Sequence, residues 1–154
     1  MAENTIVSAQ ATWTEGLQFV GRGEASGVAL VLDGAPDSGG LGSGVRPMEA
    51  LLLSLAGCTG MDVISILQKK RQRVTGLRLS LKGTRADEHP RRYVRIEIEY
   101  VVRDWEVSPE AVARSIELSQ TQYCSVRATL NCELITTYRI EQEQPGGQEP
   151  APAL

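Results

Sequence analysis

The chain has 154 residues, a length that fits one domain of ordinary size. Its 42% hydrophobic and 23% charged residues exclude a disordered or fibrous protein. A formal net charge of -3 and an aromatic content of only 5% provide neither the basic surface nor the stacking side chains that nucleic acid requires. We therefore expect no nucleic-acid partner.

Targeting signals are not visible at the start of the chain, because residues 1–5 lack a basic segment followed by an apolar one. The longest apolar run, residues 51–67, contains Asp62 and several small polar residues, whereas a bilayer span needs about 20 predominantly apolar residues. We expect a cytoplasmic protein that has no membrane partner.

The N-terminal third predicts an antiparallel meander of three strands, at residues 5–13, 17–20 and 28–32, separated by glycine-containing turns. Residues 33–46 follow with five glycines and a proline, a composition that predicts a flexible loop.

A long helix is predicted next, with Pro47 at its first position and apolar residues around most of its circumference over residues 48–72. Such a helix would be buried on nearly all sides and about 37 Å long, at 1.5 Å per residue. One small domain has too little surface to cover it, so we expect a homodimer that buries two such helices together.

The second half predicts a hairpin, two helical segments and a last strand. The hairpin strands alternate apolar and polar residues, and Ser108, Pro109 and Glu110 are typical of a helix start. The expected elements are strands 77–82 and 93–100, a helix from 108 to about 121 with Val112, Ile116 and Leu118 inward, a helical turn at 126–130, and a strand at 132–140. The grouped strands predict an α+β fold, with one domain over residues 1–141 and a disordered tail over 142–154.

Cys58 lies inside the long helix between Gly57 and Gly60, each of which costs about 1 kcal/mol of helix stability relative to alanine. Either a backbone or substrate approaches the thiol closely there, or the cysteine is a small hydrophobe in helix packing. Asp62, one turn on, disfavours a thiolate, so a reactive Cys58 needs a cationic partner.

The other candidate residues carry weaker signals. Cys124 follows the second helix, and Cys132 begins the last strand, where we assign it to packing. His89, the only histidine, lies at a predicted hairpin turn, which argues against Cys-His and Ser-His mechanisms. The spacing of the cysteines and the histidine contains no zinc motif, so we expect no metal site. The glycines of residues 39–44 do not form a phosphate-loop motif, so we expect no phosphate site there.

Residues 46–58 (RPMEALLLSLAGC) and 123–126 (YCSV), supported by residues 61–69, closely resemble the OsmC/Ohr family of thiol-dependent peroxidases over roughly residues 5–140. Pro-Met-Glu before the first cysteine is most similar to the OsmC-like subgroup. The resemblance implies an intertwined homodimer in which antiparallel sheets enclose two long central helices, with active sites at the subunit interface.

The resemblance also implies the chemistry. Cys58 matches the peroxidatic cysteine, which attacks an organic hydroperoxide, and Cys124 matches the resolving cysteine, which forms a disulfide that an external dithiol reduces. Such a peroxidase serves oxidative-stress defence and needs no metal or flavin. The alternative is a non-enzymatic dimer that binds a small apolar ligand in the same interface pocket.

The family uses a glutamate to hold an arginine that stabilises the peroxidatic thiolate. Met48 occupies the usual position of this glutamate, and Glu49 follows one residue later, about 100° further around the helix. Glu49 and Cys58 lie about 13 Å apart along a regular helix, so the glutamate would act through the partner subunit or a bridging arginine. Arg22 is the expected arginine and Arg46 its rival.

Overall fold

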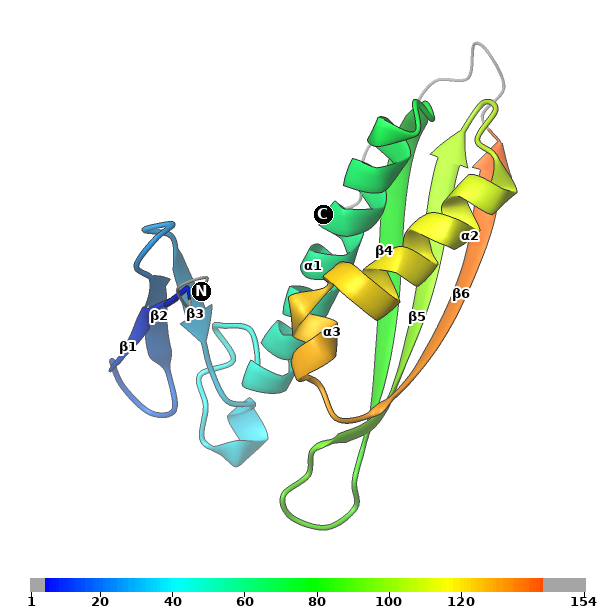
Figure 1. The fold of residues 1–154 in the computed structure, drawn as a ribbon. Helices are drawn as coiled ribbons and strands as arrows, with labels where there is room; N and C mark the ends of the chain where they lie inside the picture. Colours follow the sequence, from blue (N-terminus) through cyan, green and yellow to red (C-terminus); the bar gives the residue numbers. More distant parts are fainter. Residues whose placement is uncertain (1–4, 143–154) are drawn as a thin grey trace. The chain divides into compact units, whose positions relative to one another are not determined.

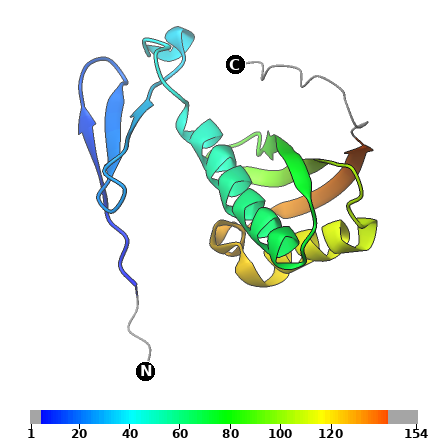
Figure 2. The same ribbon diagram turned by 90° about the horizontal axis from the view of Figure 1, so that it is seen from above.

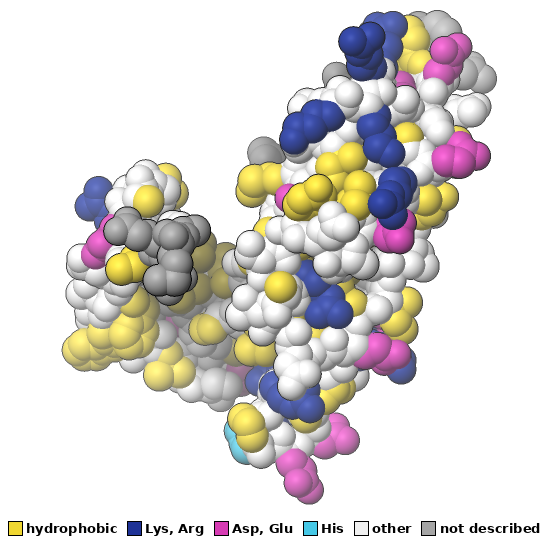
Figure 3. Space-filling model, in the orientation of Figure 1, with side chains coloured by type: hydrophobic (Ala, Val, Ile, Leu, Met, Phe, Trp, Pro, Cys, Tyr) yellow, Lys and Arg dark blue, Asp and Glu magenta, His cyan; other side chains and the backbone are white. Residues whose placement is uncertain are grey.

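The first strands pair as predicted in a computed structural model of the chain, which describes residues 5–142. Strands β1 (Ala9–Trp13), β2 (Phe19–Gly23) and β3 (Ala29–Leu32) form an antiparallel meander in the order β1-β2-β3 (Figure 1). Hydrophobic side chains gather on the surface of this sheet (Figure 3), among them Trp13 and Phe19. The meander therefore does not enclose a hydrophobic core of its own.

The glycine-rich segment after β3 is organised by a buried carboxylate. Asp33 accepts hydrogen bonds from the backbone N–H groups of Gly34, Leu41 and Ser43 and from the Ser43 hydroxyl. These bonds, led by the one from the Ser43 backbone, lower the pKa of Asp33. The segment also holds a short 3₁₀ turn, η1 (Pro36–Ser38). The prediction of a loop is confirmed, but its internal bonds give it more order than glycine content alone suggested.

The second sheet holds the principal core. It consists of β4 (Val74–Arg85), β5 (Tyr93–Asp104) and β6 (Glu133–Gln142) in the order β4-β5-β6. The β4–β5 hairpin is antiparallel, as predicted, whereas β6 pairs in parallel with β5. Because β5 has a neighbour on each side, its side chains are the most deeply buried, including Ile96, Ile98, Tyr100 and Val102.

Two helices, α1 (Pro47–Lys69) and α2 (Pro109–Leu118), lie on the same face of this sheet (Figures 1 and 2). The Ser108 hydroxyl accepts the Ala111 N–H, which confirms the predicted helix start. By length and apolar composition α1 also meets the criteria for a membrane-crossing helix, which core helices of soluble proteins meet as well.

The burial of α1 differs from the prediction of a helix covered on nearly all sides. Its buried residues follow one stripe at four-residue spacing, from Leu55 through Thr59 and Val63 to Leu67. Leu53 and Met61 remain 60% and 72% exposed. The sheet covers one face of the helix, and the exposed leucine and methionine lie on the opposite face.

The predicted second helix changes its geometry before its expected end. After α2, a π-helical turn, η2 (Ser119–Tyr123), leads through Cys124 into the short helix α3 (Ser125–Thr129).

The last strand continues to Gln142, the first residue of the predicted tail, and the rest of that tail lies outside the described residues. Internal contacts divide the described chain within α1, into one unit up to Leu51 and another from Leu52, and the single domain over residues 1–141 stays a prediction.

Candidate active site

Three reactive side chains converge in the unit that begins at Leu52. Cys58 and Asp62 are four residues apart on α1 and therefore share one helix face, while Cys124 follows the π-helical turn η2. The two sulfur atoms and a carboxylate oxygen of Asp62 all lie within 4.8 Å of one another. The structure thus brings together the two cysteines that the family resemblance pairs, and it adds a carboxylate.

Cys124 is the more deeply placed thiol, at 3% exposure, whereas Cys58 is half-buried. Burial, with smaller contributions from Cys58 and Asp62, raises the pKa of Cys124 to about 11, although the Arg127 N–H donates to its sulfur at 3.3 Å. Cys124 is therefore a neutral thiol at physiological pH and becomes a nucleophile only when a base removes its proton. The more accessible Cys58 is the better placed of the two to meet a substrate first.

A buried hydrogen-bond network holds Asp62. The Ser119 hydroxyl donates to Asp62 Oδ2 at 2.9 Å and bonds the Thr59 hydroxyl at 2.8 Å. Thr59 in turn bonds the Tyr100 hydroxyl at 2.7 Å, and the Gln120 amide donates to both Thr59 and Tyr100. Burial raises the pKa of Tyr100, so its phenol stays protonated. The network joins the site to the central strand of the sheet.

The π-helical turn places two members of this network. Ser119 and Gln120 are its first residues, and such turns occur often at functional sites. Sequence reasoning treated Asp62 only as an unfavourable charge near Cys58 and did not identify Thr59, Tyr100, Ser119 or Gln120. The sequence did offer one signal: Thr59 directly follows Cys58, and Asp62 lies one helical turn after it. The hydrogen-bond partners of these two residues come from distant segments and depend on tertiary structure.

The same three side chains are a donor set that Zn²⁺ accepts, with two thiols and one carboxylate, and the Ser119 hydroxyl would support the carboxylate. The sequence offered no sign of this set, because Cys124 comes from a segment far from Cys58 in the chain.

The arginine candidates have partners within the unit up to Leu51. The Arg22 guanidinium donates to the Gly27 carbonyl at 3.0 Å. Glu49 pairs instead with Arg46, at 3.2 Å between Oε1 and Nη1, and also accepts the Arg46 N–H. The glutamate thus bonds to the rival arginine and not to Arg22. Both side chains of the pair are about half exposed, so the contact contributes about 0–1 kcal/mol.

The remaining predicted residues lie apart from the three-residue cluster. Cys132 is half-buried just before β6, and His89 is exposed between β4 and β5. A methyl group added at Gly60 would contact Leu79 of β4 at an ordinary 3.4 Å, so the helix packs on the sheet at this position without requiring glycine. At Gly57 an added methyl group would meet the end of Met61 at 3.7 Å and no other side chain among residues 5–142.

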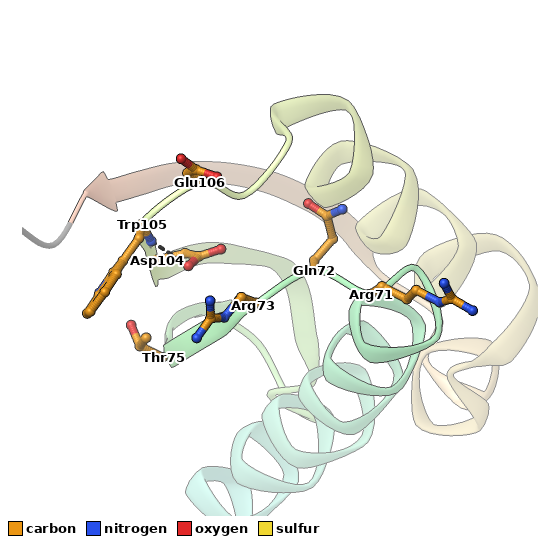
Figure 4. A pocket seen from close by; sticks show the side chains of 7 residues that line it. All are labelled: Arg71, Gln72, Arg73, Thr75, Asp104, Trp105 and Glu106. Carbon is orange, nitrogen blue, oxygen red and sulfur yellow. Dashed lines mark hydrogen bonds between the residues drawn. The ribbon is translucent and has the colours of Figure 1, made fainter. Parts of the chain in front are cut away.

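A second concave region lies where α1 leads into β4. It encloses about 430 Å³, and Figure 4 shows Arg71 and Trp105 on opposite sides of the residues that line it. The buried Asp104 accepts the Trp105 N–H through Oδ1, while its Oδ2 has no hydrogen-bond partner within the described part of the chain. No cysteine lines this region, so it offers no thiol chemistry.

Comparisons with known proteins agree with the geometry. The sequence model of the family described as OsmC-like protein matches residues 40–139. Protein YhfA of Escherichia coli strain K12 is 37% identical over 135 residues, which cover 88% of this chain and 97% of YhfA. A crystal structure of a hypothetical protein from Aquifex aeolicus VF5 is 30% identical, with a TM-score of 0.80 over 92% of this chain and 100% of that chain.

More distant structures share the fold alone. One is an organic hydroperoxide resistance protein from Elizabethkingia anophelis, which is 15% identical with a TM-score of 0.67. The match covers 92% of this chain and 100% of that chain.

Proposed function

The chain belongs to the OsmC-like protein family, and from this premise we propose that it is a thiol-dependent peroxidase that reduces organic hydroperoxides in oxidative-stress defence. The observation that carries the proposal is the approach of Cys58 and Cys124 to within 4.8 Å, one half-buried and the other buried. An accessible thiol beside a second cysteine is the arrangement that cycles reversibly between thiols and a disulfide.

The first step is attack by the Cys58 thiolate on the outer oxygen of the hydroperoxide. The O–O bond breaks, the sulfur is oxidised to a sulfenic acid, and the alkoxide takes up a proton and leaves as an alcohol. In the second step, the sulfur of Cys124 attacks the sulfur of Cys58, a disulfide forms and water leaves. An external dithiol then reduces the disulfide, restores both thiols and is itself oxidised to a disulfide.

The apolar surroundings of Cys58 support the proposed substrate class. Leu53, Gly57 and Met61 lie at four-residue spacing on α1, and Leu53 and Met61 are exposed in the single chain. We propose that this apolar face contributes to a dimer interface and that the alkyl group of the hydroperoxide binds beside it.

A count of free thiols tests the function directly. We expect one equivalent of an alkyl hydroperoxide to remove two thiols per chain from the fully reduced protein, because one disulfide forms per peroxide. The readout is reaction with a chromogenic disulfide reagent under denaturing conditions. An unchanged thiol count would contradict the peroxidase and favour a non-enzymatic dimer that binds a small apolar ligand.

Two substitutions identify which arginine supports the Cys58 thiolate. We expect the supporting residue, when changed to alanine, to slow the reaction of Cys58 with peroxide about 10- to 100-fold, because losing a nearby cation disfavours the thiolate. The sequence prediction is Arg22, whereas the Arg46–Glu49 pair favours Arg46. Stopped-flow rates of Arg22→Ala and Arg46→Ala distinguish them, and wild-type rates in both would exclude either role.

A further inference from the structure

Tyr100 connects the central strand β5 to the buried hydrogen-bond network. Its side chain is fully buried, and the phenol bonds to Thr59 of α1 at 2.7 Å and to Gln120 of the π-helical turn at 2.8 Å. We propose that Tyr100 is a positioning residue whose hydroxyl fixes η2 against α1 and so holds Cys124 where it forms a disulfide with Cys58. The inference rests on the peroxidase proposed above, whose second step forms this disulfide.

The hydrogen bonds of the network run in one direction, because each hydroxyl carries a single proton. The Ser119 hydroxyl donates to Asp62 at 2.9 Å, so it accepts from Thr59 in the 2.8 Å bond between them. Thr59 then has no proton left for Tyr100, so the phenol donates to Thr59 and accepts from the Gln120 amide. Tyr100 therefore acts as donor and as acceptor, and a phenylalanine at this position would make neither bond.

The two bonds of the phenol reach the two segments that carry the cysteines. Thr59 directly follows Cys58 on α1. Gln120 belongs to η2, and the backbone N–H of Cys124 closes this turn by donating to the carbonyl of its first residue at 2.9 Å. The phenol thus joins the turn that ends at Cys124 to the helix position next to Cys58.

The anchoring of Gln120 depends on the phenol. Its amide nitrogen donates to Tyr100 at 2.8 Å and to Thr59 at 3.3 Å, and its amide oxygen is buried without a hydrogen-bond partner in the described part of the chain. Loss of the phenol would leave this side chain with the longer bond alone. Disulfide geometry is strict, with sulfur atoms about 2.05 Å apart, so a shift of η2 against α1 would hinder bonding between the thiols.

The test uses Tyr100→Phe, which keeps the buried ring and removes both bonds. We expect the effective concentration of one thiol at the other to fall about tenfold, which raises the reduction potential of the Cys58–Cys124 disulfide by about 30 mV. The full-length protein is equilibrated in dithiothreitol redox buffers, and thiol trapping with peptide mass spectrometry measures the potential. After one equivalent of alkyl hydroperoxide, the sulfenic acid of Cys58 should form at the wild-type rate and convert to the disulfide about tenfold more slowly.

Ser115→Ala is the matched control. The Ser115 hydroxyl is equally buried and donates to the Ala111 carbonyl within α2 at 2.7 Å, so this variant also loses a buried hydrogen bond but should keep the wild-type potential. Thr59→Val should raise the potential as Tyr100→Phe does, whereas Thr59→Ser should restore it because the hydroxyl is retained. This pair decides the question if Tyr100→Phe does not fold.

A wild-type potential in a folded Tyr100→Phe protein, or in Thr59→Val where that protein does not fold, would overturn the positioning role and leave the peroxidase intact. An equal shift of the potential in Ser115→Ala would also overturn it, since any buried hydrogen bond would then have the same effect. A wild-type protein that never forms the Cys58–Cys124 disulfide would overturn both proposals. If the disulfide forms in redox buffers but peroxide oxidises neither thiol, the peroxidase alone fails, because the potentials are measured without peroxide.

Discussion

Replacing Cys58 with serine is expected to abolish peroxide consumption. A serine hydroxyl is a far weaker nucleophile than a thiolate at neutral pH, so no sulfenic acid forms in its place. Cys124 does not substitute for it, because burial holds that residue as a neutral thiol at 3% exposure. The measurement is loss of an alkyl hydroperoxide in the presence of a dithiol. Unchanged consumption by Cys58→Ser would remove the peroxidase proposal.

Substitution of the second cysteine separates sulfenic acid formation from disulfide formation. Cys124→Ser should still consume about one equivalent of peroxide, because the first step needs only Cys58, and then stall as a sulfenic acid. A dimedone-type probe should label it, and excess peroxide should oxidise it further. Cys132→Ser is the matched control, since that half-buried residue lies outside the cluster of Cys58, Asp62 and Cys124, and turnover should remain near wild type. A Cys58–Cys132 disulfide in the oxidised protein would reassign the resolving residue.

Local chemistry made much of the fold predictable. Pro47 and Ser108 mark helix starts because a first-turn proline and a capping hydroxyl act within a few residues of themselves. The alternation of β4 and β5 likewise reflects one buried and one exposed sheet face. The structure confirms these predictions because the interactions that cause these features act within short segments.

Features that depend on distant residues were not predicted. The parallel pairing of β6 with β5 is set by the path of the chain through α2, η2 and α3, and periodicity carries no information on strand direction. The Asp62–Ser119 bond joins residues that become neighbours only after α2 packs on the sheet. In the sequence, Asp62 was interpreted as an isolated charge, although the fold gives it a hydrogen bond from Ser119 and places it beside two thiols.

The exposed apolar face of α1 is the basis for the homodimer that we propose. Leu53 and Met61, at 60% and 72% exposure in the single chain, lie opposite the stripe that packs on the sheet. Burying such surface contributes roughly 25 cal/mol per Å², and a second copy presents the same face. The hydrophobic side chains exposed on the β1–β3 meander provide further surface that association would cover.

Sedimentation velocity at micromolar concentration is expected to give about twice the 16.7 kDa of one chain. The double substitution Leu53→Asp and Met61→Asp should shift the protein to monomer, because burying an unpaired carboxylate costs several kcal/mol and the interface would hold four of them. Val94→Asp introduces the same charge at a partly exposed position on β5, away from this helix face, and should leave the dimer intact. A wild-type monomer that remains folded would contradict the dimer, and dissociation by Val94→Asp alone would place the interface on the sheet instead of on α1.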